Sequence, residues 1–146
     1  MAIVVRALAQ QDRKGWEALW RGYMDFYETD LSADIDTLWG RLMEPPPEGP
    51  FALVAETAQG ELVGLAQYLF HVTTWSNASR CYLNDLFTAP QARGQGVGRA
   101  LIEAVDERAK AAGASQLWWL TQEFNDTARR LYDRLATVTP FVKYVR

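Results

Sequence analysis

The sequence has little of what metal and disulfide chemistry require: it holds a single cysteine, Cys81, and a single histidine, His71. One cysteine excludes an internal disulfide, and the pair is too small a set for a structural zinc site. Long apolar runs are also lacking. The opening run Ile3–Val5 is too short for a signal peptide and for the roughly 20 residues of a membrane helix. We therefore expect a cytoplasmic protein with no metal and no membrane partner.

The charge pattern excludes a further class of function. Fifteen Lys and Arg stand against eighteen Asp and Glu, which gives a net charge of −3, and no block of basic residues interrupts the chain. A protein that binds nucleic acid through its backbone needs a concentrated positive surface, so no nucleic-acid partner is expected. With 146 residues, 49% hydrophobic and 23% charged, the chain matches one globular domain spanning residues 1–146.

The hydrophobic pattern changes its period along the chain. Apolar residues at three- and four-residue steps predict helices, and shorter runs rich in β-branched or alternating residues predict strands. A Pro-rich linker at 45–50 separates the second helix from a predicted β-hairpin. The expected helices cover about 16–27, 35–42, 97–112 and 125–135, and the expected strands cover 3–6, 51–57, 62–71, 81–88, 116–120 and 141–145, with a polar loop over 74–80.

The most informative stretch is a glycine-rich loop between a predicted strand and a predicted helix, Arg93-Gly94-Gln95-Gly96-Val97-Gly98. Glycines at every second position remove side chains and allow positive φ, so that backbone N–H groups converge near the positive end of a helix. The pattern indicates a cradle for an anion, most naturally a pyrophosphate, with Arg93 and Arg99 beside it. It fits neither a Walker loop, which needs Gly-Lys-Ser/Thr, nor a dinucleotide fingerprint, whose third glycine would stand at Arg99.

The form Arg-x-x-Gly-x-Gly resembles the acetyl-CoA-binding motif of the GNAT superfamily of N-acetyltransferases. The stretch Tyr82–Ile102 is similar to that family's central strand, loop and helix, and Asn125–Tyr132 is similar to its Asn-x-x-Ala-x-x-Leu/Phe-Tyr helix. Within the superfamily the chain is most similar to the polyamine and histone-type members, such as the spermidine/spermine acetyltransferases.

The resemblance implies an α/β fold of three layers, with helices on both faces of a mixed, mostly antiparallel sheet. Its fourth and fifth strands, 81–88 and 116–120, would run parallel and splay apart around the cosubstrate acetyl-CoA. It also implies a homodimer. By position in the motifs, the pantetheine arm would meet Leu86, Phe87, Thr88 and Asn125, the pyrophosphate would meet Arg93, Gly94, Gln95, Gly96, Val97 and Gly98, and the sulfur would face Tyr132.

Acetyl transfer to an amine requires an acid for the departing thiolate and a way to deprotonate the amine. Tyr132 suits the first role because a phenol of pKa about 10 stays protonated at neutral pH. Taken alone, Tyr132 fits an amphipathic tyrosine in a helix packed on a core better than it fits an acid; the glycine motif beside it favours the catalytic interpretation. The second role is needed because an alkyl amine of pKa near 10.4 is neutral in only about one molecule in a few thousand at pH 7.

The sequence differs from the polyamine-type members at the position of a candidate general base. The polyamine-type relatives read Tyr-Leu-Glu-Asp at this point, and this chain has Asn84 in place of the Glu. An amide accepts no proton, so the role passes to Asp85, to another acid or to water. Alternation along a strand would place Asp85 on the face opposite Asn84. Tyr132, Asn84 and Asp85 are the catalytic candidates.

The stretch 25–36 holds five acidic residues and no Lys or Arg. It is a candidate for attracting a cationic amine, and it equally fits a solvated connection between two helices. We expect an N-acetyltransferase acting on a primary amine of a small molecule, a polyamine or amino metabolite first and a protein lysine or N-terminus second. The alternative is a non-catalytic acetyl-CoA-binding sensor or assembly module.

Overall fold

The computed structural model of the protein describes residues 2–146. Its single sheet has five strands in the order β1-β2-β3-β4-β5, with β1 to β4 antiparallel and β4 parallel to β5. This mixed sheet confirms the expected fold class. The strands are β1 (Ile3–Ala7), β2 (Phe51–Thr57), β3 (Leu62–Thr73), β4 (Ser76–Thr88) and β5 (Leu117–Trp118).

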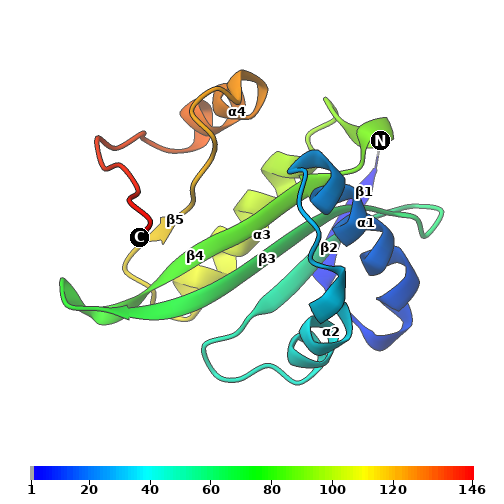
Figure 1. The fold of residues 1–146 in the computed structure, drawn as a ribbon, viewed down its shortest axis with the longest axis horizontal. Coiled ribbons are helices and arrows are strands. Elements are labelled where there is room, and N and C mark those ends of the chain that lie inside the picture. The colour runs from blue at the N-terminus through cyan, green and yellow to red at the C-terminus, as the bar shows by residue number, and fades with distance from the viewer. Residues whose placement is uncertain (1) are drawn as a thin grey trace.

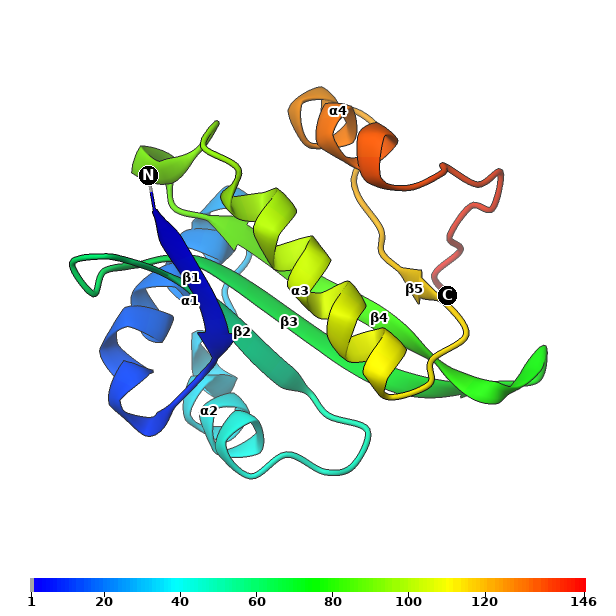
Figure 2. The same cartoon turned by 180° about the vertical axis from the view of Figure 1, so that it is seen from behind.

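Helices cover both faces of the sheet. Figures 1 and 2 show α1 (Arg13–Phe26) and α2 (Ile35–Met43) on one face, α3 (Val97–Ala111) along the other face, and α4 (Asp126–Leu135) beyond the β5 edge. None of the helices in residues 2–146 has the length and apolar character needed to cross a membrane.

The sheet separates two hydrophobic cores. Because side chains alternate along a strand, Leu53 of β2 faces the α3 core and its neighbour Val54 faces the α1–α2 core. Trp16 of α1 and Leu101 of α3 are fully buried anchors on the two sides. Burial of such side chains stabilises the fold by roughly 1.5–3 kcal/mol each, so both helix layers are fixed firmly against the sheet.

Three strand predictions differ from the structure. β4 starts at Ser76, because residues 76–80 continue the β3–β4 hairpin instead of forming a loop. β5 has two residues instead of five, because the chain leaves β4 after Trp118 and no ladder follows. The predicted strand over 141–145 is absent: its residue types favour a strand, but within residues 2–146 it has no ladder partner, which a strand requires.

A β-bulge in β4 reorients the residues that follow it. Gln67 of β3 pairs with Asp85, whereas the next residue, Tyr68, pairs with Leu83, so that Asn84 is left without a partner. The extra residue turns the strand, and Asp85 faces the α1 side of the sheet. The expectation that Asn84 and Asp85 point to opposite faces is therefore wrong: Asn84 Nδ2 donates a hydrogen bond to Asp85 Oδ1 at 2.9 Å.

A close approach at Gly64 of β3 sets the position of α3. A Cβ atom at Gly64 would lie 2.6 Å from Val97 Cγ1 and 2.9 Å from Leu101 Cδ1. Only a glycine allows the first turns of α3 to pack this tightly on the sheet. The glycine-rich loop directly precedes Val97, so this contact also holds the loop in place.

We predict that Gly64→Ala destabilises the protein by about 1–3 kcal/mol, because the added methyl group overpacks the contact with α3. Chemical denaturation of the purified variant measures this. Gly40→Ala is the matched control, since nothing lies within 4 Å of a Cβ at that helical position and alanine there should stabilise by a few tenths of a kcal/mol up to about 1 kcal/mol. Equal stability of the two variants would contradict the packing argument.

Candidate active site

The site begins where β4 and β5 part. The two strands pair only at Cys81–Leu117 and Tyr82–Trp118. Beyond Tyr82, β4 continues to Thr88 with β3 on one side and, within residues 2–146, no strand on the other. Its backbone N–H and C=O groups on that open side are available to an extended ligand, in the way an added strand is recognised. The predicted parting of the two strands is confirmed.

The glycine-rich loop lies at the end of this open edge. Gly94 and Gly96 have φ of 76° and 83°, the left-handed region that favours glycine. Gly96 caps α3, whose first N–H groups have no partners within the helix and carry partial positive charge. Nothing lies within 4 Å of a Cβ at Gly94 or Gly96, so the loop leaves open space above these donors. The loop therefore has the form expected of an anion cradle.

The two arginines beside the loop already have protein partners. Arg93 Nε donates to the backbone oxygen of Thr88 at 3.0 Å. Its guanidinium lies 5.5 and 5.6 Å from the ring centroids of Phe26 and Phe87. Arg99 pairs with Glu103 at 2.8 Å on the exposed face of α3. Arg93 thus braces the loop against β4 and α1, and Arg99 has a weak surface pair that an anion can replace.

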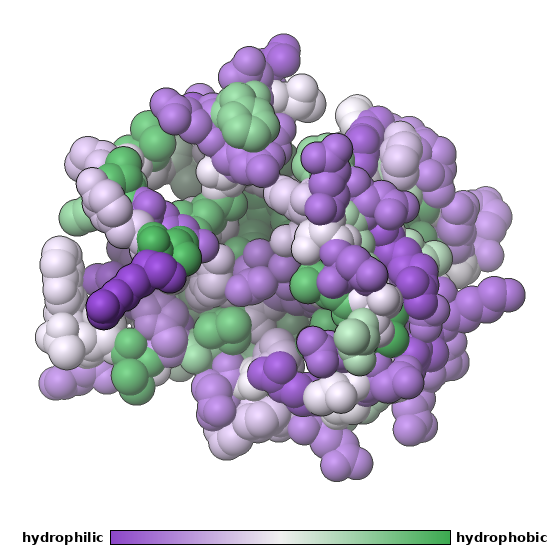
Figure 3. Space-filling view, in the orientation of Figure 1, coloured by the Kyte–Doolittle hydropathy of each residue, from purple (hydrophilic) through white to green (hydrophobic). Residues whose placement is uncertain are grey.

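A pocket of about 350 Å³ lies beside the open edge of β4. Figure 3 shows the surface hollowed here, between the part that carries α4 and the part that carries β4. Four tyrosines from α1, β4 and α4 are prominent in its wall. The lining residues are Tyr23, Tyr27, Tyr82, Leu83, Asn84, Leu86, Trp119, Leu120, Thr121, Gln122, Tyr132 and Lys143.

A buried carboxylate lies behind this pocket and is held by a chain of hydrogen bonds. Trp16 Nε1 donates to Gln67 Oε1 at 2.9 Å, which fixes the amide so that Gln67 Nε2 donates to Asp85 Oδ2 at 2.9 Å. Asn84 Nδ2 donates to the other oxygen. Gln67 and Asp85 are only 3% and 8% exposed. A buried carboxylate without such donors would be strongly unfavourable, so these contacts are what allow Asp85 to occupy this position.

The pKa of Asp85 reflects two opposing effects. Burial raises the pKa, and hydrogen bonds from Gln67, Tyr23 and Asn84 lower it, with burial the larger effect. The same burial acts on the neighbouring phenols: it raises the pKa of Tyr23, and the carboxylate of Asp85 raises it further. Asp85 is therefore a carboxylate with an increased affinity for a proton, surrounded by phenols that stay protonated at neutral pH.

Tyr132 and Asn125 are both contributed by the α4 region. Burial raises the pKa of Tyr132 to about 12, with a smaller contribution from Tyr27. The ring of Tyr132 packs edge-on against Trp119 at 5.5 Å between centroids. Asn125 is the N-cap of α4, where its side chain accepts from the backbone N–H of Ala128 at 3.5 Å. The protein thus uses Asn125 to start the helix that carries Tyr132.

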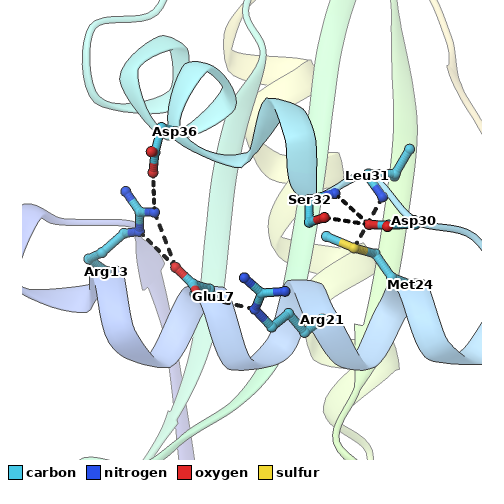
Figure 4. A network of polar contacts seen from close by, with 8 residues as sticks. All are labelled: Arg13, Glu17, Arg21, Met24, Asp30, Leu31, Ser32 and Asp36. Atoms are coloured by element: carbon cyan, nitrogen blue, oxygen red, sulfur yellow. Dashed lines mark hydrogen bonds and ion pairs between the residues drawn. The ribbon is translucent and has the colours of Figure 1, made fainter.

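The acidic stretch 25–36 contributes Tyr27 but no carboxylate to the tyrosine pocket. Figure 4 shows Asp36 pointing to Arg13 of α1, with an ion pair of 2.6 Å, and Asp30 bonded to Ser32. Because two of its carboxylates are paired locally and none lines the pocket, the stretch fits the helix-connection interpretation. A larger hollow of about 510 Å³ lies between α1 and the start of β3, but it holds neither the tyrosines nor the glycine-rich loop.

Sequence reasoning missed part of this site. Gln67 and Trp16 were not singled out, although Gln67 is a polar residue inside the apolar run 62–70 and gave a detectable signal. Lys143 was also missed, because its position at the pocket depends on the path of the chain after α4. Nothing in the sequence relates Tyr23 to Asp85. The structure adds its position beside Asp85.

Comparison with known proteins agrees with this geometry. The profile of the Acetyltransferase (GNAT) family matches residues 14–136. A D-amino-acid N-acetyltransferase of Saccharomyces cerevisiae is 37% identical over 99% of this chain and 90% of its own length. A thialysine N-epsilon-acetyltransferase of Bos taurus is 39% identical over 60% of the chain and 56% of its own length.

Solved structures share the fold at low sequence identity. A ribosomal-protein-alanine N-acetyltransferase from Brucella melitensis has a TM-score of 0.83 at 20% identity, over 99% of both chains. AAC(6′)-Iy, solved with the bisubstrate analogue CoA-S-monomethyl-acetylneamine, has a TM-score of 0.86 at 17% identity, over 100% of this chain and 98% of its own. With a matched family profile over most of the chain and a relative matched almost end to end, the chain belongs to the GNAT family of acetyltransferases.

Proposed function

We propose that this acetyltransferase moves an acetyl group from acetyl-CoA to the primary amine of a small molecule. One observation carries the proposal: the open edge of β4 connects the glycine-rich loop with a pocket that is lined by the phenol of Tyr132 and has the buried carboxylate of Asp85 behind its wall. A donor with a pyrophosphate at one end and a thioester at the other fits this path. Family membership supports the same reaction.

The donor would be held at three places. The backbone N–H groups at Gly94, Gly96 and the start of α3 would receive the pyrophosphate. The open edge over 86–88 would pair with the amide groups of the pantetheine arm. Gly98 lies at this path, because a Cβ there would be in van der Waals contact with Leu131 of α4 at 3.4 Å and with Thr88 Oγ1 at 3.9 Å.

In the proposed reaction the amine nitrogen attacks the thioester carbonyl, a C–N bond forms and the C–S bond breaks. Asp85 accepts the proton that the amine loses, directly or through one water, and Tyr132 gives its proton to the departing thiolate. Asn84 donates its Nδ2 to Asp85, which leaves its Oδ1 free to orient the incoming ammonium. Proton transfers of this kind contribute roughly 10²–10⁴-fold each.

The pocket size and the relatives support a small acceptor. About 350 Å³ accommodates a small molecule, and the relatives compared above are named for D-amino acids and for thialysine. A polyamine would gain little from the acidic stretch, because none of its carboxylates lines the pocket. We therefore place amino metabolites ahead of polyamines as acceptors.

The donor cradle is tested by Gly96→Ala. Alanine at φ 83° is strained and distorts the start of α3, so we expect acetyl-CoA affinity to fall about tenfold or more by calorimetry. Gly113→Ala is the control, because Gly113 has φ 77° with open space around it but lies at the other end of α3. If both variants bind acetyl-CoA equally well, the cradle assignment is wrong.

The acid role is tested by Tyr132→Phe. We expect thiol release from acetyl-CoA with an accepted amine to fall about 10²-fold or more in kcat, while the affinity for CoA stays within twofold because the ring still packs on Trp119. Tyr144→Phe is the control, since Tyr144 is almost fully exposed. Binding of acetyl-CoA without thiol release for any amine would instead favour the non-catalytic binding module.

The base role is tested by following the protonation of Asp85 directly. In a ¹³C-carboxyl NMR titration, Asp85 should titrate above the value of about 3.9 typical of aspartate, because burial raises its pKa. Removing a donor that favours the charged form raises the pKa further, so Gln67→Leu should move both this midpoint and the acid limb of kcat/KM to higher pH. Asp85→Asn should lower kcat about 10²-fold or more. An acid limb that stays unmoved in Gln67→Leu would exclude Asp85 as the base.

A further inference from the structure

The charges around the tyrosine pocket carry information about the acceptor beyond its amine. Of all the residues that line the pocket, Lys143 alone is charged at neutral pH. Within residues 2–146, no ion pair joins Lys143 to a carboxylate. A protonated amine at the wall of a site that receives cationic amines is unfavourable unless the substrate also brings a negative charge.

We propose that Lys143 forms a carboxylate subsite, and that the acceptor is an amine that also carries a carboxylate, such as a free amino acid. This inference rests on the proposed function, because it assigns the second charged group of the substrate in the same pocket. The ammonium end would point toward Asp85 and Asn84, and the carboxylate end toward the Lys143 ammonium.

The other groups around the pocket are consistent with this polarity. Asp85, from β4, provides negative charge behind the wall. From the remaining elements the pocket receives only neutral polar groups, namely the phenols of Tyr23, Tyr27, Tyr82 and Tyr132 and the side chains of Asn84, Thr121 and Gln122. A zwitterion therefore meets one opposite charge at each end, whereas a polyamine meets a like charge at Lys143.

The experiment compares an amino acid with the amine that lacks its carboxylate. Phenylalanine, in both enantiomers, and phenethylamine form one pair, and leucine and isoamylamine form another. Wild-type protein should give a kcat/KM for the amino acid that is roughly 10–100-fold higher than for its amine, the range expected for a hydrogen bond to a charged group.

Substitution at Lys143 should remove this preference selectively. Lys143→Ala should lower kcat/KM about 10-fold or more for the amino acid and leave it unchanged or somewhat higher for the amine, which no longer meets a like charge. Lys143→Arg should retain most of the preference, and Lys143→Glu should reverse it. Arg146→Ala is the matched control, because Arg146 is an exposed cation of the same segment that does not line the pocket, and it should behave as wild type.

A second readout separates the failure of this inference from the failure of the proposed function. Binding of N-acetylphenylalanine and of N-acetylphenethylamine, measured by calorimetry, needs no turnover. A carboxylate preference that disappears in Lys143→Ala supports the subsite even if no acceptor is acetylated. Equal binding and equal turnover of the paired compounds, or a preference unchanged in Lys143→Ala, would overturn the subsite and leave the transferase proposal intact. Loss of thiol release with every amine would count against the transferase alone.

Discussion

The site depends on the absence of a strand partner along the outer side of β4. Beyond Tyr82, the only ladder that β4 makes with the described part of the chain is with β3. Unpaired backbone groups of a strand are costly when they are buried away from water. Here they are unpaired because the chain from Trp119 onward leaves the sheet, and α4 lies beyond its edge. The open edge, the pocket between β4 and α4, and access to the glycine-rich loop all follow from that one departure.

A second constraint is the burial of Asp85. The bulge at Asn84 turns this carboxylate toward the α1 core, where Trp16 and Gln67 form a fixed chain of donors behind it. Because Trp16 is fully buried, its indole N–H cannot turn to solvent, and the orientation of the Gln67 amide is set by the core and not by the substrate. The packing of α1 on the sheet therefore contributes, through Trp16 and Gln67, to the pKa of Asp85 behind the pocket.

Much of the fold was predictable because its signals are local. The period change after Pro50, the glycines of the loop and the asparagine cap of α4 each act over a few residues, and the elements they indicate are present. The bulge was not predictable, since no glycine or other local signal marks Asn84 and the irregularity arises from how β3 and β4 pair. The strand expected over 141–145 failed for the opposite reason: its residue types favour a strand, but a strand also needs a neighbouring edge.

Asn84 cannot act as a general base, but its presence is consistent with that role for the neighbouring Asp85. A Glu at position 84 would place two carboxylates side by side at positions 84 and 85. Here a neutral amide lies 2.9 Å from the single carboxylate, so no like charge forces the pair to share a proton. The amide donates to Asp85 and lowers its pKa, while burial raises it. With one carboxylate in place of two, the pocket also has less negative charge to attract a polycation, and the positive charge of Lys143 is not neutralised by a second acid at the wall.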